Sequence, residues 1–277
     1  MSHPSSHPRR IGVFDSGFGG LTVLEAMLRQ LPAAEFLYLG DTARLPYGAK
    51  SRETVARYAV SSAEFLLAQG AEYLVIACNT ASALALDAIR AAVPVPVLGV
   101  VETGANAAQT HSRSGDVMVI ATAATVESHA YLAACRERKL RAIEKACPLL
   151  VPLVEEGWID HPVTREVLNI YFSELLDQAR VAALEPDTLL LGCTHYPLLR
   201  RQIENALPRS IRVIDSAEVT AAQVAASVRV PGGGAAPPAP HFFATDSPEK
   251  FRRLGSRFLG QPIHHVELID LESSTPG

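Results

Sequence analysis

Short apolar runs alternate along the chain with longer segments of helical periodicity. Runs of this length and composition are typical of buried strands, and they cover residues 10–14, 35–39, 73–77, 95–100, 117–121, 188–191 and 211–214. Apolar side chains three and four positions apart predict helices over 21–31, 51–69, 80–92, 126–138 and 216–227, a long helix after Pro162 and another after Pro197. Strand–helix alternation predicts an α/β fold with mainly parallel sheets.

Two segments of the chain resemble each other. LVIACNTAS (Leu74–Ser82) and LLLGCTHYP (Leu189–Pro197) both run from a buried strand to a cysteine, then a threonine, then a predicted helix. Each follows an earlier strand that ends in small hydroxyl residues, IGVFDSG or VMVIATA. The likeness predicts two similar α/β domains in a pseudo-twofold arrangement, although a chance match between common α/β segments is the alternative at this point.

The predicted domains are not continuous in the sequence, because the chain returns to the first after completing the second. We predict a first domain from residues 10–99 with 213–268 and a second from 100–212. Residues 1–9 and 269–277 are predicted to be flexible tails. The segment PGGGAAPPAP (231–240) cannot form a helix or a central strand and is predicted to be a surface loop.

Composition narrows the class of protein. The 277 residues are 48% hydrophobic and 19% charged, as in globular domains, and the net charge of −4 offers no case for nucleic acid or an anionic membrane as a partner. No apolar run reaches the roughly 18 residues of a membrane helix. MSHPSSHPRR has no apolar segment typical of a signal peptide. We therefore expect a cytoplasmic protein.

Candidate chemistry gathers where predicted strands end, which is where open α/β sheets bind ligands. Four polar clusters lie at such ends: Asp15-Ser16, Cys78-Asn79-Thr80, Thr122 with Thr125, and Cys193-Thr194-His195. If the two halves face each other, Cys78 and Cys193 lie across one cleft. The other two cysteines, Cys135 and Cys147, lie outside these motifs and are expected in the core.

Two facing thiols suit the inversion of a carbon centre. Such a reaction removes a hydrogen from one face and returns one to the other, so it needs a base and an acid that exchange roles. A thiol, with an ordinary pKa of about 8.5, can supply either form. The predicted helix starts favour thiolate at both Cys78 and Cys193. Asp15 is a candidate partner for Cys78, and His195 for Cys193.

Neighbouring polar groups suit an acidic amino acid. Hydroxyl and amide groups that could hold carboxylates come from Ser16, Asn79, Thr80, Thr125 and Thr194. The glycine-rich turn 17–20 could hold an anion or could simply be a tight turn. Tyr47 and Gly48 lie in a predicted loop that could cover the cleft or be an ordinary turn.

Together these residues resemble the glutamate racemase family, within the wider aspartate/glutamate/hydantoin racemase group. The likeness runs from Arg10 to about His265 and rests on FDSGFGGLTVL, LPYGAKS, IACNTAS, TAATVESHAY, CPLLVPLVEEG, LLGCTHYPLL, IDSAE and FFATDSPEKF. It implies catalytic roles for Cys78 and Cys193, where the first handles the proton of the D-enantiomer and the second that of the L-enantiomer.

The resemblance also implies assisting roles for Asp15, His195 and Glu155. It implies substrate contacts from Asp15, Ser16, Tyr47, Gly48, Asn79, Thr80, Thr194 and His195, to which we add Thr122 and Thr125. One departure is Ala121, where the family usually has glycine, and its methyl group is expected to shift the end of that strand slightly. Relatives that act on aspartate usually have Glu after the second Cys-Thr and lack the Asp-Ser-Gly opening, so His195 and Asp15-Ser16 favour glutamate.

The resulting prediction is cofactor-independent interconversion of L- and D-glutamate, which supplies D-glutamate for peptidoglycan, by a homodimer without a metal. A racemase of aspartate and a non-enzymatic protein that binds acidic ligands are the alternatives. A zinc site from Cys78, Cys193 and His195 lacks the paired spacing of structural zinc. A pyridoxal enzyme needs a buried lysine, whereas the lysines here lie in polar surroundings.

Overall fold

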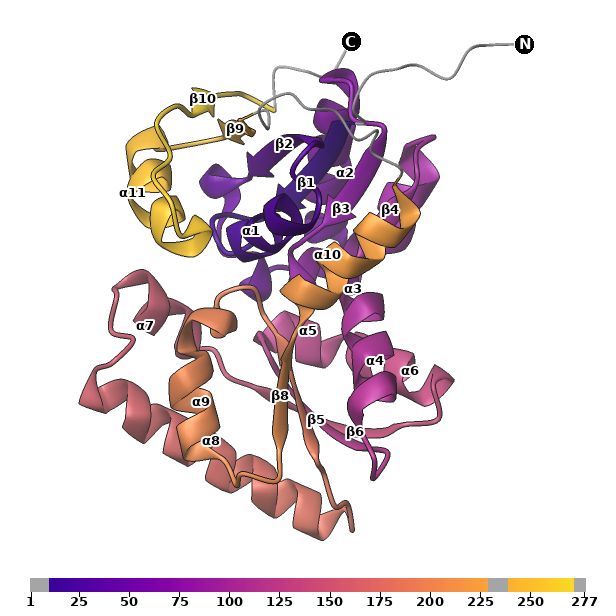
Figure 1. Cartoon of the computed structure of the whole chain (residues 1–277), viewed down its shortest axis with the longest axis vertical. Coiled ribbons are helices and arrows are strands. Elements are labelled where there is room, and N and C mark those ends of the chain that lie inside the picture. The colour runs from indigo at the N-terminus through magenta and orange to yellow at the C-terminus, as the bar shows by residue number, and fades with distance from the viewer. Residues whose placement is uncertain (1–9, 229–238, 272–277) are drawn as a thin grey trace.

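Two parallel sheets organise the protein (Figure 1). The computed structural model describes residues 10–228 and 239–271. The first sheet, in spatial order, consists of β10 (Glu267–Leu268), β9 (His241–Ala244), β2 (Glu35–Gly40), β1 (Arg10–Asp15), β3 (Tyr73–Ile76) and β4 (Val97–Gly99). The second consists of β6 (Arg141–Ala146), β5 (Asp116–Ala121), β7 (Thr188–Gly192) and β8 (Arg212–Asp215). All neighbouring strands pair in parallel, which confirms the predicted fold class.

The two sheets repeat one strand order. In the first half β1 lies between β2 and β3 with β4 beyond; in the second, β5 lies between β6 and β7 with β8 beyond. Cys78 follows β3 and Cys193 follows β7, so the two cysteines occupy equivalent places in the two halves. In such sheets a ligand crevice forms where the strand order reverses, at the carboxyl ends of the central strands.

Helices cover the faces of both sheets. Around the first sheet lie α1 (Leu21–Gln30), α2 (Arg52–Ala68), α3 (Asn79–Ala92), α10 (Ser216–Ser227), α11 (Pro248–Leu259) and the 3-10 turns η1 (Thr42–Arg44) and η2 (Tyr47–Ala49). Around the second lie α4 (Val100–His111), α5 (Ala123–Glu127), α6 (Ala130–Glu137), α7 (Leu150–Glu155), α8 (Pro162–Val181), α9 (Arg200–Ala206) and the 3-10 turn η3 (Tyr196–Leu199). Across the described residues, no helix has both the length and the apolar character needed to cross a membrane.

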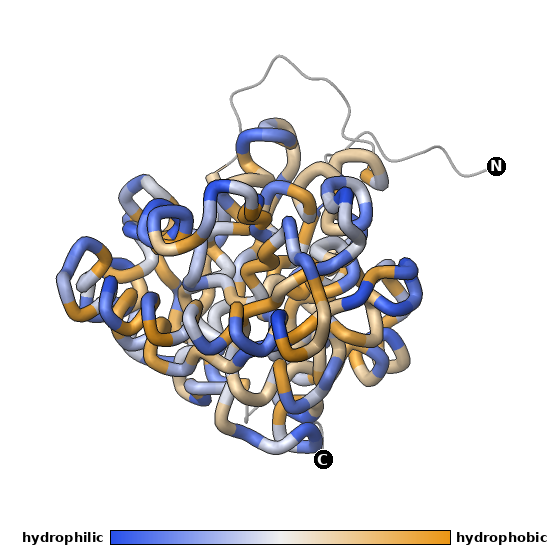
Figure 2. Tube along the Cα trace, turned by 90° about the horizontal axis from the view of Figure 1, so that it is seen from below, coloured by the Kyte–Doolittle hydropathy of each residue, from blue (hydrophilic) through white to orange (hydrophobic). Residues whose placement is uncertain are grey.

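One apolar cluster continues from the first half into the second. Along β1, Ile11 and Val13 face this cluster while Phe14 faces a second one, as the alternation of a strand requires. The shared cluster also includes Met118 and Ile120 of β5. Helix α10 packs against both α1 and α4, and in Figure 1 it runs from the end of β8 alongside the first half. In Figure 2 apolar positions concentrate within the trace and hydrophilic ones towards the outer loops.

Several predicted elements differ in the structure. The helix predicted over 126–138 is two helices, α5 and α6, separated at His129, whose φ of 55° interrupts the helix. Strand β6 was not predicted, because its charged residues break up the apolar pattern. The helix expected after Pro197 begins as the 3-10 turn η3 and continues as α9. The strand predicted over 95–100 ends at Gly99, where α4 follows.

The predicted return to the first domain at residue 213 is misplaced, because β8 pairs with β7 in the second sheet. The chain leaves that sheet after Asp215, whose side chain caps α10. Folded structure also continues past residue 268, since Leu271 is buried in an apolar cluster of the first half. Parts of the predicted tails and loop lie outside the described residues. These parts are residues 1–9, 231–238 and 272–277.

The Asp187→Ala substitution is expected to lower the free energy of unfolding by about 1–3 kcal/mol. Asp187 precedes β7 and accepts hydrogen bonds from Ser112 Oγ (2.7 Å), Arg113 N (2.7 Å) and Ser114 N (2.9 Å). Burial alone would raise the pKa of Asp187, but these hydrogen bonds outweigh it and hold the pKa well below its usual range. Its contribution should therefore be present above about pH 4 and be lost as pH falls towards the folded-state pKa.

Denaturant unfolding at pH 7 and pH 3 measures both effects. Asp177→Ala is the control, because Asp177 forms an exposed ion pair with Arg180 and its loss should change stability by less than about 0.5 kcal/mol. Equal losses in the two variants at pH 7 would contradict the assignment of a structural role to Asp187.

Candidate active site

Cys78 lies at the start of α3, directly beyond β3, and is 5% exposed. Its thiol donates a hydrogen bond to Ser16 Oγ (3.4 Å) and accepts one from Ala81 N–H (3.4 Å). Burial and the negative charge of Asp15 raise the pKa of Cys78 to about 12, although the hydrogen bonds act in the opposite direction. The start of α3 favours thiolate as expected, because the hydrogen bond from Ala81 N–H lowers the pKa of Cys78, but burial and the charge of Asp15 outweigh this effect.

Asp15 ends β1, the strand beside β3, and its side chain is buried. Its Oδ2 accepts a hydrogen bond from Gly17 N–H (2.8 Å), whereas Oδ1 has no hydrogen-bond partner within the described residues. Burial raises the pKa of Asp15, although the hydrogen bond from Gly17 opposes the rise. Asp15 therefore has an unpaired acceptor oxygen and lies close enough to Cys78 for its charge to affect the thiol.

Cys193 has a different set of neighbours. Its Sγ lies 4.0 Å from His195 Nδ1, and Nε2 of the same ring lies 3.2 Å from Glu155 Oε1, on α7. Burial alone would lower the pKa of His195, but the interactions with Cys193 and Glu155 outweigh it and raise the pKa to about 10. A cationic imidazole therefore bridges the second cysteine and a carboxylate.

The helix expected at Cys193 is absent from the structure. Cys193 and the next two residues follow β7 without helical structure, and the 3-10 turn η3 then begins at Tyr196. The group that approaches this sulfur is therefore the imidazole of His195, and no helix begins there.

The glycine-rich turn 17–20 brings the two halves close together. A Cβ atom on Gly19 would lie 2.1 Å from Thr194 Oγ1 and 2.7 Å from His195 Nδ1, so only glycine fits this approach. Thr22 Oγ1 also donates to the carbonyl of Thr194 (3.4 Å). The glycines of this turn therefore allow the two halves to make contact. Neither of the two interpretations given from the sequence, an anion site or a tight turn, had predicted this contact.

Three hydroxyl groups from the two halves form a triangle. Thr80 Oγ1 lies 3.0 Å from Thr122 Oγ1 and 3.2 Å from Thr125 Oγ1, and the latter two lie 3.0 Å apart. Thr80 belongs to α3, whereas Thr122 and Thr125 follow β5. Despite Ala121, the strand end therefore brings both threonines to the first half.

Tyr47 and Gly48 form part of the 3-10 turn η2 beside this triangle. Tyr47 is buried, and its hydroxyl donates to Asp41 Oδ2 at 2.5 Å. A Cβ atom on Gly48 would lie 3.0 Å from Thr122 Cβ, so the turn contacts the second half closely. Asp41 was not predicted, since a single acidic residue after a strand carries no motif of its own.

These groups surround one cavity of about 780 Å³. The predicted residues that line it are Ser16, Tyr47, Gly48, Cys78, Asn79, Thr80, Thr122, Glu155, Cys193, Thr194 and His195. Asp15 and Thr125 lie outside its lining, although Thr125 contacts two lining residues. Lys50 and Lys250 also line the cavity and were not predicted to do so. Two cysteines, several hydroxyl groups and two lysines therefore line the same cavity.

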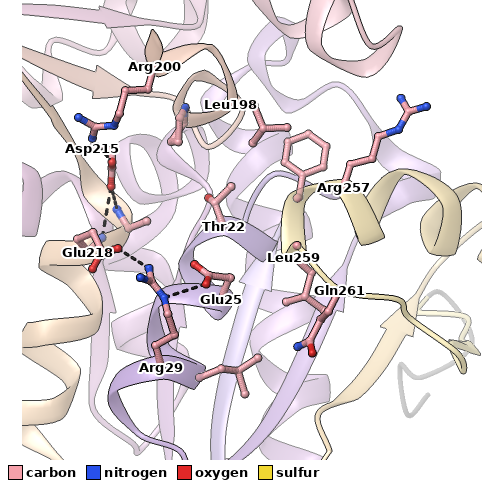
Figure 3. A pocket seen from close by; sticks show the side chains of 15 residues that line it. Thr22, Glu25, Arg29, Leu198, Arg200, Asp215, Glu218, Arg257, Leu259 and Gln261 are labelled. Carbon is pink, nitrogen blue, oxygen red and sulfur yellow. Dashed lines mark hydrogen bonds and ion pairs between the residues drawn. The ribbon is translucent and has the colours of Figure 1, made fainter. Parts of the chain in front are cut away.

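A second cavity, of about 570 Å³, carries different chemistry (Figure 3). Ion pairs line it: Arg29 pairs with Glu25 and Glu218, and Arg200 with Asp215. Its lining contains neither cysteine nor histidine. Elsewhere too, in residues 10–228 and 239–271, no three His, Cys, Asp or Glu side chains gather as a metal site.

Known proteins are similar to this chain in sequence and in fold. The family model described as Asp/Glu/Hydantoin racemase matches residues 11–224. A protein named glutamate racemase from Koribacter versatilis is 52% identical over 94% of this chain and 97% of its own. The structure of a glutamate racemase isoform from Bacillus anthracis matches with a TM-score of 0.87 and 36% identity over 96% of this chain and 99% of that chain.

A crystal structure of glutamate racemase from Francisella tularensis in complex with D-glutamate is also similar. It has a TM-score of 0.86 and 34% identity, and covers 96% of this chain and 98% of that chain.

The Glu155→Gln substitution is expected to lower the pKa of His195 by about 1–2 units, because it removes the carboxylate beside Nε2. A histidine with a raised pKa stabilises the folded state fully below its unfolded pKa, about 6.5, and loses this contribution as pH rises through its folded pKa. The stability difference between the unchanged protein and the variant should therefore shrink as pH rises through about 10.

Imidazole NMR titration and denaturant unfolding between pH 6 and pH 11 measure these two quantities. Glu156→Gln, at the exposed neighbouring position, is the matched control and should leave the titration of His195 unchanged. An unaltered titration in Glu155→Gln would show that Glu155 does not hold the imidazole cationic.

Proposed function

The chain belongs to the Asp/Glu/hydantoin racemase family, and we propose that it is an isomerase that interconverts L- and D-glutamate without a cofactor. One observation carries the proposal. Cys78 and Cys193 end equivalent strands of two similar halves and line a single cavity. A planar intermediate between them would present one face to each sulfur.

In the direction from L- to D-glutamate, Cys193 acts as the base and Cys78 as the acid. The positive charge of His195 stabilises negative charge on the sulfur of Cys193, which removes the Cα proton of the L-enantiomer. Cys78, whose raised pKa keeps it protonated, then delivers a proton to the opposite face. This order agrees with the roles that the family resemblance implies.

The reverse direction requires Cys78 to lose its proton. Burial and the negative charge of Asp15 oppose that loss. The ammonium group of a bound amino acid would offset both, because it adds positive charge beside the forming thiolate. Asp15 lies outside the cavity lining, so we assign it to orient Cys78 and to attract the ammonium group through its charge.

The remaining groups suit the two carboxylates of the substrate. Hydroxyl groups of Ser16, Thr80 and Thr194 line the cavity and can donate hydrogen bonds. Lys50 and Lys250 add positive charge to its walls, which attracts an acidic substrate. A dicarboxylic amino acid meets these conditions better than a neutral one. Among acidic substrates, the resemblance at His195 and Asp15-Ser16 favours glutamate over aspartate.

D-Glutamate made in this way would supply peptidoglycan synthesis in a bacterial cytoplasm. We propose this role from the family resemblance, together with a homodimeric assembly. Relatives from other bacteria are named glutamate racemase, which supports the activity on which this role depends.

Incubation with L-glutamate in heavy water should produce D-glutamate that carries deuterium at Cα, because the added proton comes from a thiol in exchange with solvent. Circular dichroism follows the loss of optical activity and NMR the deuterium content. Activity should survive EDTA and need no added cofactor. Faster turnover of aspartate would assign the aspartate alternative, and no turnover or exchange with either would leave only a binding protein.

Substitution of either site cysteine should abolish racemisation. We expect Cys78→Ala and Cys193→Ala each to lower kcat at least about 100-fold, since each removes the acid or base that the proposed mechanism assigns to that face. Cys135→Ala is the control, because Cys135 is equally buried but lies outside the cavity lining. A site variant as active as this control would remove that cysteine from the mechanism.

A further inference from the structure

We propose that Tyr131 is a positioning residue that orients the side-chain amide of Asn79 towards the substrate. This inference rests on the proposed function, because it assigns the amide to a carboxylate of the bound amino acid. Tyr131 belongs to α6 of the second half, whereas Asn79 is the first residue of α3 and directly follows Cys78.

One buried hydrogen bond joins the two residues across the halves. The hydroxyl of Tyr131 donates to Asn79 Oδ1 at 2.6 Å. Tyr131 is 0% exposed and Asn79 is 2% exposed, so water does not compete for this contact. Burial raises the pKa of Tyr131 far above its ordinary value, and the hydroxyl therefore keeps the proton that it donates.

The other end of the amide has no partner. Asn79 Nδ2 is buried and makes no hydrogen bond within the described residues, although Asn79 lines the cavity. Buried donors are almost always satisfied in proteins, so an unpaired donor on a residue that lines a cavity is available to an acceptor that binds there. With Oδ1 occupied by Tyr131, Nδ2 is the end left for an acceptor, and a carboxylate oxygen is the acceptor that an acidic amino acid supplies.

The ring of Tyr131 also contacts the backbone next to Cys193. A Cβ atom on Gly192 would lie 2.9 Å from Tyr131 Cε2, so the ring rests against the backbone directly before Cys193. On its other side, a Cβ on Gly104 would lie 3.3 Å from Cε1. A single side chain therefore touches the segment of Cys193 with its ring and holds the neighbour of Cys78 with its hydroxyl.

Tyr131 acts through Asn79 and not on the substrate. It is absent from the residues that line the cavity, as far as the described chain extends. Removal of its hydroxyl should therefore weaken substrate binding, while the acid and base groups remain in place. Because a bond lost equally from the bound substrate and the transition state changes KM and not kcat, the two constants distinguish positioning from catalysis.

The test is the Tyr131→Phe variant, with KM and kcat measured for L- and D-glutamate. We expect KM to rise about tenfold for both enantiomers, with kcat changed less than about threefold. Tyr73→Phe is the matched control, because Tyr73 is 7% exposed, has a hydrogen bond with Ser227, and lies at the opposite end of β3 from Cys78. An unchanged KM in Tyr131→Phe, or an equal rise in the control, would overturn the proposal.

A double substitution separates positioning from a general loss of structure. If Tyr131 acts only through Asn79, Tyr131→Phe should add no further rise in KM to Asn79→Ala. If Tyr131 had only a structural role, the increases in KM from the two single substitutions would instead multiply in the double variant.

The Asn79→Asp variant tests the orientation of the amide even if Tyr131→Phe fails to fold. It keeps an acceptor for Tyr131 but presents an oxygen in place of Nδ2 to the carboxylate. KM should rise at least about 100-fold, because like charges then meet in the cavity. A KM near that of the unchanged protein would overturn the proposal. Lack of turnover by the unchanged protein would instead reject the proposed function, and this inference with it.

Discussion

The shared apolar cluster between the two halves is the interaction on which the rest of the site depends. Residues of β1 and α1 in the first half and of β5 and β7 in the second belong to one buried cluster, and α10 packs against both halves. Hydrophobic burial has no direction of its own, so polar contacts of defined geometry have to set the final alignment. The threonine triangle, the close approach at Gly19, and the bond from Tyr131 to Asn79 provide these contacts.

The two cysteines occupy equivalent places but different electrostatic surroundings. Cys78 has a buried carboxylate nearby and stays protonated, whereas Cys193 has a cationic imidazole held by Glu155. The repeated strand order explains why the sulfurs meet at one cavity. The residues around the two sulfurs differ, and in the proposed mechanism this difference lets one act as an acid while the other acts as a base, since their neighbours carry charges of opposite sign.

Much of this site could be predicted from the sequence, because the ends of parallel strands meet at one edge of a sheet. That rule places Asp15 beside Cys78, and the likeness of the two cysteine segments predicts a matching half. Glu155 needed the family resemblance, since its exposed neighbour Glu156 has the same chemistry. Tyr131 could not be found, because its partner lies 52 positions away and on the other half. The break in the helix at His129 could not be predicted either, because no proline or glycine marks it in the sequence.

The unequal surroundings of Cys78 and Cys193 have a thermodynamic consequence. Enantiomers have equal free energies in water, so the equilibrium constant of a racemisation is one. The ratio kcat/KM must then be the same in both directions, whatever each sulfur contacts. The charges of Asp15 and His195 can make one enantiomer bind more tightly than the other only if that enantiomer also reacts more slowly once bound. Evolution can therefore adjust the resting occupancy of this site, but it cannot give the site a preferred product.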